Sequence, residues 1–327
     1  MSATMTAVID THAHVYPDHW LDLLEELGTD PATTRIARGL HAGDDEADIS
    51  RRLAMMDAAG VRVQVLSATP QVPVLDNADD ASSAARYIND AYAALVARHP
   101  DRFIAHATLP LPHVAGSLDE IARAFDELGF RSVALNTFVG ADGSLADPAL
   151  EPIFAELDRR RAIVYLHPAG LAAGAASIAD HGLIWVNGAP MEDAIATLQL
   201  LKADVPDRHS HIRFHIAHLG GDLPFLAQRL EDNYDDWGSF ARSPRESLRR
   251  MWFDAANFFT PSLRLALEVY GDGHVMMGSD FPYFQDAKYT RAVTYINDLA
   301  DLSVGAEVID NVLRRNAEQL YGELLPR

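Results

Sequence analysis

Short apolar segments alternate with helical segments along almost the whole chain, and this alternation is the strongest constraint on the fold. The expected strands are Ala7–His14, Val61–Ser67, Phe103–Leu109, Ser132–Phe138, Ala162–His167, Ile212–His218, Trp252–Ala256 and Val275–Asp280. Segments with helical patterns, such as 78–98 and 191–202, separate them. Strict alternation favours parallel strands joined by right-handed crossovers, and eight units suit a closed barrel better than an open sheet. We therefore predict an α/β fold, specifically a (β/α)8 TIM-like barrel.

The whole chain, residues 1–327, is expected to form this single domain. Hydrophobic residues make up 48% of it and charged residues 23%, a composition that can bury one large core. We find no linker or low-complexity run that would divide it. Proline and glycine interrupt the stretch 15–46 after the first strand, and such a long loop in a compact domain is usually functional. We expect this stretch to be a loop or lid insertion.

The charge and composition of the chain exclude several classes of partner. The formal net charge is −20 and the pI is about 4.9, so the surface repels nucleic acid and anionic membranes. No apolar run is long enough to span a bilayer, and we expect a cytoplasmic protein that acts on a small molecule. The chain has no cysteine, so any metal site must be built from His, Asp and Glu.

The first expected strand ends in two histidines one residue apart. Side chains alternate between the faces of a strand, so His12 and His14 point to the same side, close enough to share a metal ion. Neutral imidazole is a common ligand of zinc and similar ions, but two ligands need completing by others. Taken alone, the pair is equally compatible with a turn or a surface position. The other strands therefore decide between these alternatives.

Three further strands end in residues that bind metals or transfer protons. The active site of a (β/α)8 barrel lies at the carboxyl ends of its strands. There the sequence places His167, His218 and Asp280, each where an apolar run gives way to Gly or Pro. Any one of these alone is compatible with a hydrogen-bonded structural residue or a helix cap. Their convergence on one rim, together with the first strand, predicts a metal site.

The strand-end motifs together resemble the amidohydrolase superfamily. The matching motifs are Asp10-Thr11-His12-Ala13-His14, Leu166-His167-Pro168, Ala217-His218-Leu219-Gly220-Gly221 and Gly278-Ser279-Asp280-Phe281-Pro282, with the segments 56–67 and 188–196. More narrowly, they are similar to the branch that contains aminocarboxymuconate semialdehyde decarboxylase, γ-resorcylate decarboxylase and 6-methylsalicylate decarboxylase. The resemblance covers nearly the whole chain and is weakest over residues 15–46.

This resemblance implies a centre with one metal ion. His12, His14, His167 and Asp280 would hold a divalent ion, usually zinc and sometimes manganese, with a water at the open position. His218 would be the acid/base residue, sharing proton transfer with Asp280. Superfamily members with two metals use a carboxylated lysine in the fourth strand, and residues 132–138 contain no lysine, so a single ion is expected. The resemblance also implies a homodimer.

The activity implied by the resemblance is that of a metal-dependent, non-oxidative decarboxylase, a carboxy-lyase. Its substrate would be a small aromatic or conjugated carboxylic acid similar to an ortho-hydroxybenzoate. The alternative is a hydrolase of a lactone, amide or related C–O or C–N bond that uses a metal-activated water, because the ligand set serves both reactions. A third hypothesis is a barrel that binds metal or ligand without catalysis. The residues that we expect to contact substrate are Asn136, Trp185, Asn187, Phe281 and Tyr283.

Two expectations concern the remaining cationic and titratable residues. Related decarboxylases hold the substrate carboxylate with arginines, sometimes one from the neighbouring subunit. The candidates in this chain are Arg35, Arg38, Arg51 and Arg242. If none reaches the pocket, the carboxylate depends on the metal alone, which weakens the decarboxylase hypothesis.

His215 and His218 have opposite parity in a strand, so we expect only His218 to face the lumen and His215 to be packed or on the outer face.

Overall fold

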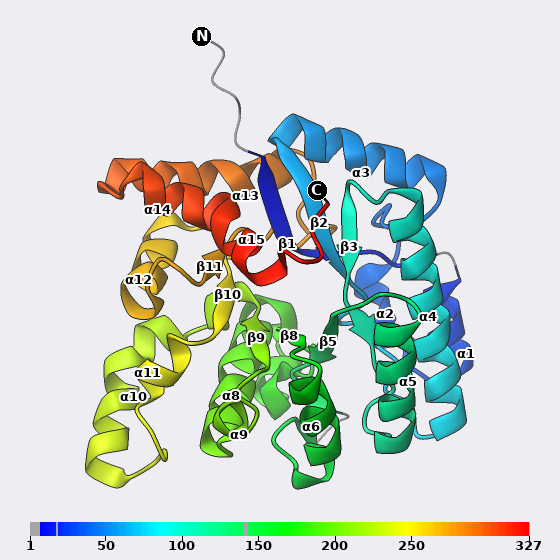
Figure 1. Ribbon diagram of the computed structural model, residues 1–327, viewed down its shortest axis with the longest axis horizontal. Coiled ribbons are helices and arrows are strands. Elements are labelled where there is room, and N and C mark those ends of the chain that lie inside the picture. Colours follow the sequence, from blue (N-terminus) through cyan, green and yellow to red (C-terminus); the bar gives the residue numbers. More distant parts are fainter. Residues whose placement is uncertain (1–6, 18, 140–142, 327) are drawn as a thin grey trace.

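A computed structural model describes residues 7–17, 19–139 and 143–326, and its strands form a barrel surrounded by helices (Figure 1). The barrel strands are β1 (Val8–His14), β2 (Val61–Ser67), β3 (Phe103–Ala105), β4 (Ala107–Thr108), β5 (Ser132–Asn136), β8 (Ile163–His167), β9 (Arg213–Ile216), β10 (Trp252–Asp254) and β11 (Val275–Met276). Every pairing between these strands is parallel. A short hairpin, β6 (Phe138–Val139) and β7 (Gly143–Ser144), is the antiparallel exception in the described part of the chain.

The barrel closes through two joints between sheets. The described strands form a three-stranded sheet, β1-β2-β3, and a six-stranded sheet, β11-β10-β9-β8-β5-β4. One joint is the predicted strand 103–109, which breaks at His106 into β3 and β4. At the other joint, the Thr11 amide donates to the Met277 carbonyl at 2.9 Å, and Ala13 pairs with Phe281. The prediction of a (β/α)8 barrel is confirmed.

A β-bulge in β1 decides which of its side chains face the lumen. Asp10 pairs with Gln64 of β2, whereas Ala13 pairs with Leu66, so β1 has one residue more than its partner between these positions. The side chain of Asp10 therefore contacts Tyr289 of helix α13 (Ala287–Asn297), outside the barrel. His12, within the bulge, packs against Tyr165 inside the lumen.

Helices follow the strands and form the outer layer (Figure 1). The longer ones are α3 (Glu46–Ala59), α4 (Ala78–Arg98), α5 (Val114–Asp126), α6 (Glu151–Arg159), α8 (Ala189–Lys202), α10 (Leu223–Trp237), α12 (Thr260–Tyr270) and α13. The shorter ones are α1 (Trp20–Glu26), α2 (Pro31–Thr34), α7 (Ala176–Ala179), α9 (Val205–Arg208), α11 (Pro244–Leu248), α14 (Ala306–Asp310) and α15 (Asn316–Tyr321). Side-chain caps fix several starts: Asp45 accepts two amides of α3, and Asn77 accepts two of α4.

The lumen opposite the carboxyl ends of the strands is filled by apolar side chains and closed by α15. Ile9, Val63, Ile163 and Met276 form a buried cluster with Ala317, Leu320 and Tyr321 of α15. Figure 1 shows this last helix beside β1, β10 and β11. Because this end is closed by packing, any solvent-accessible site must lie at the other end.

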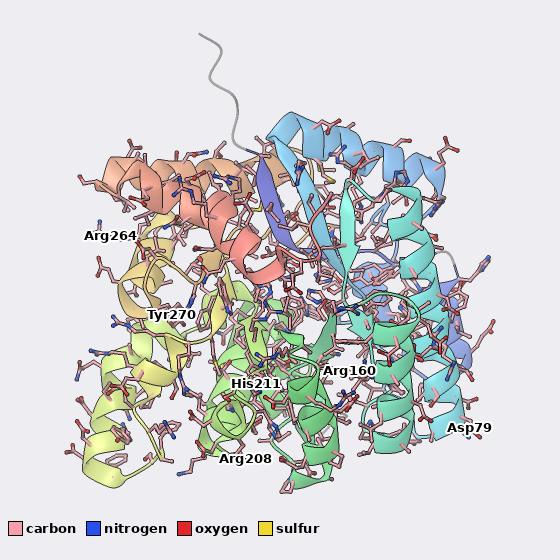
Figure 2. All side chains as sticks on the ribbon, viewed as in Figure 1. Asp79, Arg160, Arg208, His211, Arg264 and Tyr270 are labelled. Atoms are coloured by element: carbon pink, nitrogen blue, oxygen red, sulfur yellow. The ribbon has the colours of Figure 1, made fainter. Side chains whose placement is uncertain are left out.

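Charged side chains lie on the outer surfaces of the helices. Arg160 pairs with Asp126, and His211 pairs with Asp158 (Figure 2). An exposed pair such as that of His211 with Asp158 contributes little to stability. No helix in the described ranges has the length and apolar character needed to cross a membrane.

Candidate metal centre

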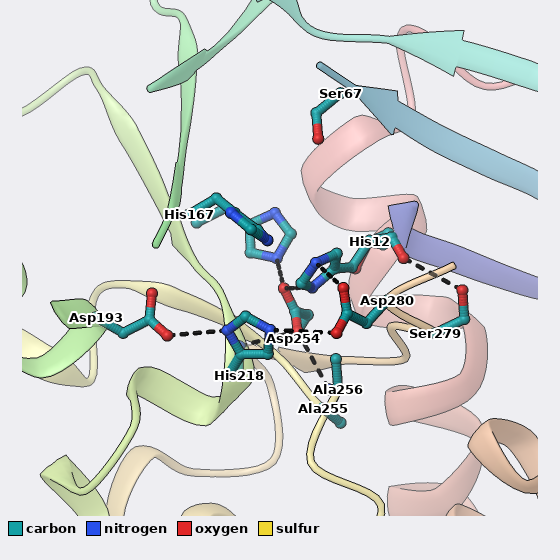
Figure 3. Close-up of polar contacts among 12 residues, drawn as sticks. His12, Ser67, His167, Asp193, His218, Asp254, Ala255, Ala256, Ser279 and Asp280 are labelled. Atoms are coloured by element: carbon teal, nitrogen blue, oxygen red, sulfur yellow. Dashed lines mark hydrogen bonds and ion pairs between the residues drawn. The ribbon is translucent and has the colours of Figure 1, made fainter. Parts of the chain in front are cut away.

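Four potential ligands from three distant parts of the chain meet at the mouth of the barrel. One donor atom from each of His12, His14, His167 and Asp280 lies within 4.8 Å of the others. His12 Nε2 is 3.2 Å from His14 Nε2 and 3.3 Å from Asp280 Oδ1, and His14 Nε2 is 3.4 Å from the same oxygen. The histidines come from the ends of β1 and β8, and Asp280 follows β11 (Figure 3). The structure thus brings together all four predicted ligands.

The three imidazoles are oriented alike, with Nδ1 engaged by a neighbour and Nε2 directed at the centre. The partners of Nδ1 are Asp254 Oδ2 for His12 at 3.1 Å, Ser67 Oγ for His14 at 3.0 Å, and the Pro168 carbonyl for His167 at 2.9 Å. Such partners fix the ring orientation and tautomer of metal-binding histidines. The arrangement directs Nε2 of each ring at the same point, where it can offer a lone pair when the ring is neutral.

The donor set fits a divalent cation. His167 Nε2 is buried and has no hydrogen-bond partner, although buried polar atoms rarely lack one. Burial lowers the pKa of His14 to about 4 and holds that of His167 well below its usual value, so both rings are neutral at pH 7. Histidine interactions hold the pKa of Asp280 well below its usual value despite the opposing effect of burial. Neutral imidazole nitrogens with one carboxylate are typical ligands of zinc and manganese.

Asp254 is a functional residue that the sequence reasoning missed. Its side chain is fully buried at the end of β10, where Oδ2 contacts His12 and Oδ1 accepts the amides of His218 and Ala256, both at 3.1 Å. Burial would raise the pKa of this carboxyl, but His12 and His215 hold it well below its usual value. The signal was present: Asp254 interrupts the apolar strand 252–256 in the same way that Asp280 ends its own strand.

His218 lies beside the four ligands and is held by Asp193. Its Nδ1 is 2.9 Å from Asp193 Oδ2, and its Nε2 is 3.7 Å from Asp280 Oδ2 (Figure 3). Burial disfavours the charged ring, but Asp193 and Asp280 outweigh it, so the pKa of His218 is raised. Burial also raises the pKa of Asp193, to about 7, against the effect of His218. The pair therefore keeps a proton on His218 near neutral pH.

Our expectation for His215 was wrong in one respect, because His215 and His218 both face the lumen. Strand β9 ends at Ile216, and His218 has a φ of +52°, so strand parity does not extend to it. His215 stays in the strand and packs against Tyr165 with 4.7 Å between ring centroids.

The turn that follows His218 needs glycine, since a Cβ on Gly221 would lie 1.9 Å from the Pro190 carbonyl oxygen.

Glu192 is a second residue that the sequence reasoning missed, and it shapes the loop after His167. Its buried carboxylate accepts five hydrogen bonds of 2.6–3.2 Å, from the Thr137 hydroxyl and the amides of Ala169, Gly170, Leu171 and Ala173. A carboxylate with this many donors satisfies a whole backbone turn. The loop that begins at Pro168 is therefore anchored to helix α8.

A cavity of about 300 Å³ opens beside the metal centre. His167, His218 and Asp280 form its polar end, and its walls are largely apolar: Ile36, Trp185, Val186, Ala189, Pro190, Ala256, Phe258 and Phe284, with Asn257 and Tyr283. Of the residues expected to contact substrate, Trp185 and Tyr283 line it. Asn136 instead donates to the Pro70 carbonyl, Asn187 is exposed, and Phe281 is buried beneath Arg52.

None of the four candidate arginines lines this cavity. Arg38 forms ion pairs with Asp22 and Glu25. Arg51 lies 3.8 Å from Asp286, and Arg242 lies 3.4 Å from Asp207. No lysine or arginine is among the described residues of the cavity wall. The expectation that one of these arginines holds the substrate carboxylate is therefore not met within one chain, and the arginines give the decarboxylase hypothesis no support. Within one chain, a substrate carboxylate must be held by the metal centre and by neutral or histidine donors.

Comparison with known proteins identifies the family. Residues 9–322 match the family model described as amidohydrolase. This chain belongs to the amidohydrolase family. The match spans the barrel from β1 to α15, so it includes all four clustered ligands and His218. The resemblance inferred from the strand-end motifs is confirmed.

Relatives of this amidohydrolase include several decarboxylases. The chain is 30% identical to 6-methylsalicylic acid decarboxylase of Penicillium expansum over 97% of each chain. It is 28% identical to 2-amino-3-carboxymuconate-6-semialdehyde decarboxylase of Dictyostelium discoideum, over 84% of this chain and 81% of the relative. Its fold matches that of a dihydroxybenzoic acid decarboxylase from Polaromonas, solved with bound manganese and the inhibitor 2-nitroresorcinol. That match has a TM-score of 0.83, 21% identity and 97% coverage of both chains.

Proposed function

We propose that this protein is a metal-dependent, non-oxidative decarboxylase of a small aromatic or conjugated carboxylic acid, similar to an ortho-hydroxybenzoate. The observation that carries the proposal is the meeting of three imidazoles, one carboxylate and a protonatable histidine at one end of an apolar cavity. His12, His14, His167 and Asp280 would hold one divalent ion, zinc or manganese. When bound, this ion supplies positive charge that orients and polarises substrate oxygens.

The cavity is suited to a flat, largely apolar ring. Trp185, Phe258 and Tyr283 supply aromatic surface, and Tyr283 is fixed by a 2.8 Å hydrogen bond between its hydroxyl and that of Tyr16. Apolar walls exclude water from a bound ring, which strengthens every electrostatic contact at the polar end. The lack of a lysine or arginine in the described wall favours a substrate with a single carboxylate over a dicarboxylate.

His218 is the proposed proton donor. Decarboxylation breaks the bond between the ring carbon and the carboxylate carbon, releases carbon dioxide and forms a new C–H bond at the same ring carbon. The proton must come from a positioned acid because protonation at carbon disrupts conjugation. Asp193 holds His218 through Nδ1, so Nε2 faces the cavity and Asp280. Asp280 would take part both as a ligand and in proton transfer.

The test is turnover of a substrate panel by protein loaded with Zn²⁺ or Mn²⁺. The panel contains ortho-hydroxybenzoates, a benzene dicarboxylate, lactones and aryl amides, and both carbon dioxide and hydrolysis products are measured. We expect carbon dioxide from a monocarboxylic ortho-hydroxy acid, and slower reaction of the dicarboxylate. Hydrolysis of a lactone or amide without carbon dioxide release would replace the proposal with the hydrolase alternative.

We further propose that the chain forms a single domain and that residues 15–46 act as a lid over the cavity. Residue 18 of this stretch lies outside the described residues. Support comes from Ile36, which lines the cavity, and from Tyr16, which bonds Tyr283. Replacing Ile36 by Gly should raise KM for the preferred substrate more than it changes kcat, because it removes one cavity wall. An unchanged KM would contradict the proposal that residues 15–46 form part of the binding site.

A homodimer is the proposed assembly. Val186, Phe225 and Phe259 are 75%, 82% and 61% exposed, and they follow β8, β9 and β10 on the side of the mouth. Large apolar side chains exposed to this extent are candidates for an interface. We expect light scattering to give twice the chain mass of 35.8 kDa, and a Phe225→Asp variant to give a smaller species. A wild-type protein that is monomeric at micromolar concentration would contradict the dimer.

A further inference from the structure

A column of buried polar side chains connects the metal centre to the closed end of the barrel. Asp254 Oδ2 lies 3.1 Å from His12 Nδ1 and 3.3 Å from His215 Nε2. His215 Nδ1 lies 2.8 Å from the hydroxyl of Tyr321, a residue of the last helix, α15. The same hydroxyl lies 3.5 Å from His106 Nε2. Every one of these side chains is at most 1% exposed, so water does not compete for their contacts.

The negative charge of Asp254 favours one order of the hydrogen positions in this column. Asp254 is an anion that accepts from His12, and its Oδ2 lies 3.3 Å from His215 Nε2, outside hydrogen-bond geometry. A hydrogen on that nitrogen makes this charge contact attractive. A neutral His215 then has a lone pair on Nδ1, which accepts from the Tyr321 hydroxyl. The opposite tautomer would place the lone pair of Nε2 against the carboxylate at 3.3 Å, which is repulsive.

This order of the hydrogen positions extends to His12, one of the proposed metal ligands. Asp254 accepts from His12 Nδ1, so the lone pair of a neutral His12 ring lies on Nε2, at the centre. Partners beyond a ligand influence metal affinity through ring orientation and tautomer. Tyr321 is thus the last group in a series that fixes His12, although it belongs to a different region of the chain from any ligand.

We propose that Tyr321 is a positioning residue for the metal centre: its hydroxyl sets the tautomer of His215, and through Asp254 it fixes His12 for metal binding. This inference rests on the proposed function for its metal site. Tyr321 touches neither substrate nor ligand. Through this series of contacts, a residue of α15, which closes the amino-terminal end of the barrel, influences metal binding at the opposite end.

The experiment compares Tyr321→Phe with a matched control, Tyr270→Phe. Both variants lose one buried hydroxyl with a hydrogen bond of 2.8–2.9 Å, to His215 for Tyr321 and to the Leu219 carbonyl for Tyr270. The Tyr321 hydroxyl has in addition the 3.5 Å contact with His106. Affinity for Zn²⁺ is measured by chelator competition on the full-length apoprotein. Second-layer partners typically change affinity about 10–100-fold, and we expect Tyr321→Phe to weaken it by about 10-fold, at the lower end, because it acts through two other residues. The control should stay within about two-fold of wild type.

The tautomer of His215 is read directly by long-range ¹H–¹⁵N correlation in the apoprotein, with a His215→Gln spectrum for assignment. Wild type should show the Nε2–H form, and Tyr321→Phe should populate Nδ1–H. In an Asp254→Asn background, Tyr321→Phe should cause no further loss of affinity, because the connection to His12 is already broken.

The outcomes separate the two proposals. Unchanged metal affinity in Tyr321→Phe, with or without a change in tautomer, overturns the positioning role. Equal losses in both tyrosine variants also overturn it, since they indicate a general effect of lost stability. If wild type binds neither Zn²⁺ nor Mn²⁺, the proposed function fails, and the His215 spectrum of that apoprotein still decides whether Tyr321 sets the tautomer.

Discussion

Replacing Asp254 by Asn should damage the metal centre more than any change outside the four ligands. Asp254 Oδ1 already accepts two backbone amides, so the asparagine oxygen would stay there. Its NH₂ group would then face His12 Nδ1, which donates to Asp254 in the native protein, and would lie beside His215 Nε2. To restore a hydrogen bond, His12 must move its proton to Nε2, which is the nitrogen aimed at the metal.

The expected magnitude follows from this geometry. Loss of a partner behind a metal ligand typically weakens binding by about 10–100-fold. We expect the upper limit, about 100-fold or about 2.7 kcal/mol, because the contact is fully buried and the substitution reverses its polarity. Asp254 and Asp280 also raise the pKa of His12 to about 9 in the metal-free protein, although burial opposes them. Wild type should therefore release about one proton on metal binding at pH 7.5, and Asp254→Asn should release less.

Both quantities come from calorimetric titration of apoprotein with Zn²⁺ in two buffers of different ionisation enthalpy. Asp193→Asn is the matched control, because Asp193 is also a buried aspartate bonded to a histidine, but that histidine is His218 rather than a ligand. Its metal affinity should stay within about three-fold of wild type. The reasoning is refuted if Asp254→Asn also stays within that range, or if it releases as many protons as wild type.

Three further predictions follow from the site. His218→Asn should keep metal affinity and lower kcat by about 10²–10⁴-fold, the typical contribution of a general acid; full turnover would remove His218 from the mechanism. Glu192→Gln should destabilise the protein by about 3 kcal/mol in denaturant unfolding, because the one remaining acceptor oxygen cannot satisfy five donors, which are buried or partly buried. A loss below about 1 kcal/mol would contradict this. In the metal-free protein, the pKa of His14 is about 4 when folded and about 6.5 when unfolded, so protonation favours the unfolded chain. The free energy of unfolding should therefore fall by up to about 3 kcal/mol as the pH falls from 6.5 toward 4. A His14→Gln apoprotein that loses as much stability as wild type between these pH values would argue against it.

Local sequence was sufficient for the architecture because each strand and helix carries its own pattern. β2 was predicted with its observed bounds, Val61–Ser67, and α4 with its bounds, 78–98. The four clustered ligands were found for the same reason. In a parallel barrel, the residue at the carboxyl end of each strand lies on one rim, so position along the strand stands for position in space.

Tertiary structure decided what surrounds that rim. The strand that carries His215 ends two residues before His218, and a left-handed turn returns His218 to the lumen, which parity alone excluded. Glu192 and Tyr321 act through partners 19 to 106 positions away in the chain, so no local pattern marks them. Asp254 interrupts an apolar strand, but its partner His12 lies 242 positions away. Periodicity reports which way a side chain points relative to its own backbone, whereas a hydrogen bond depends on where a different segment has packed, and only the folded chain determines that.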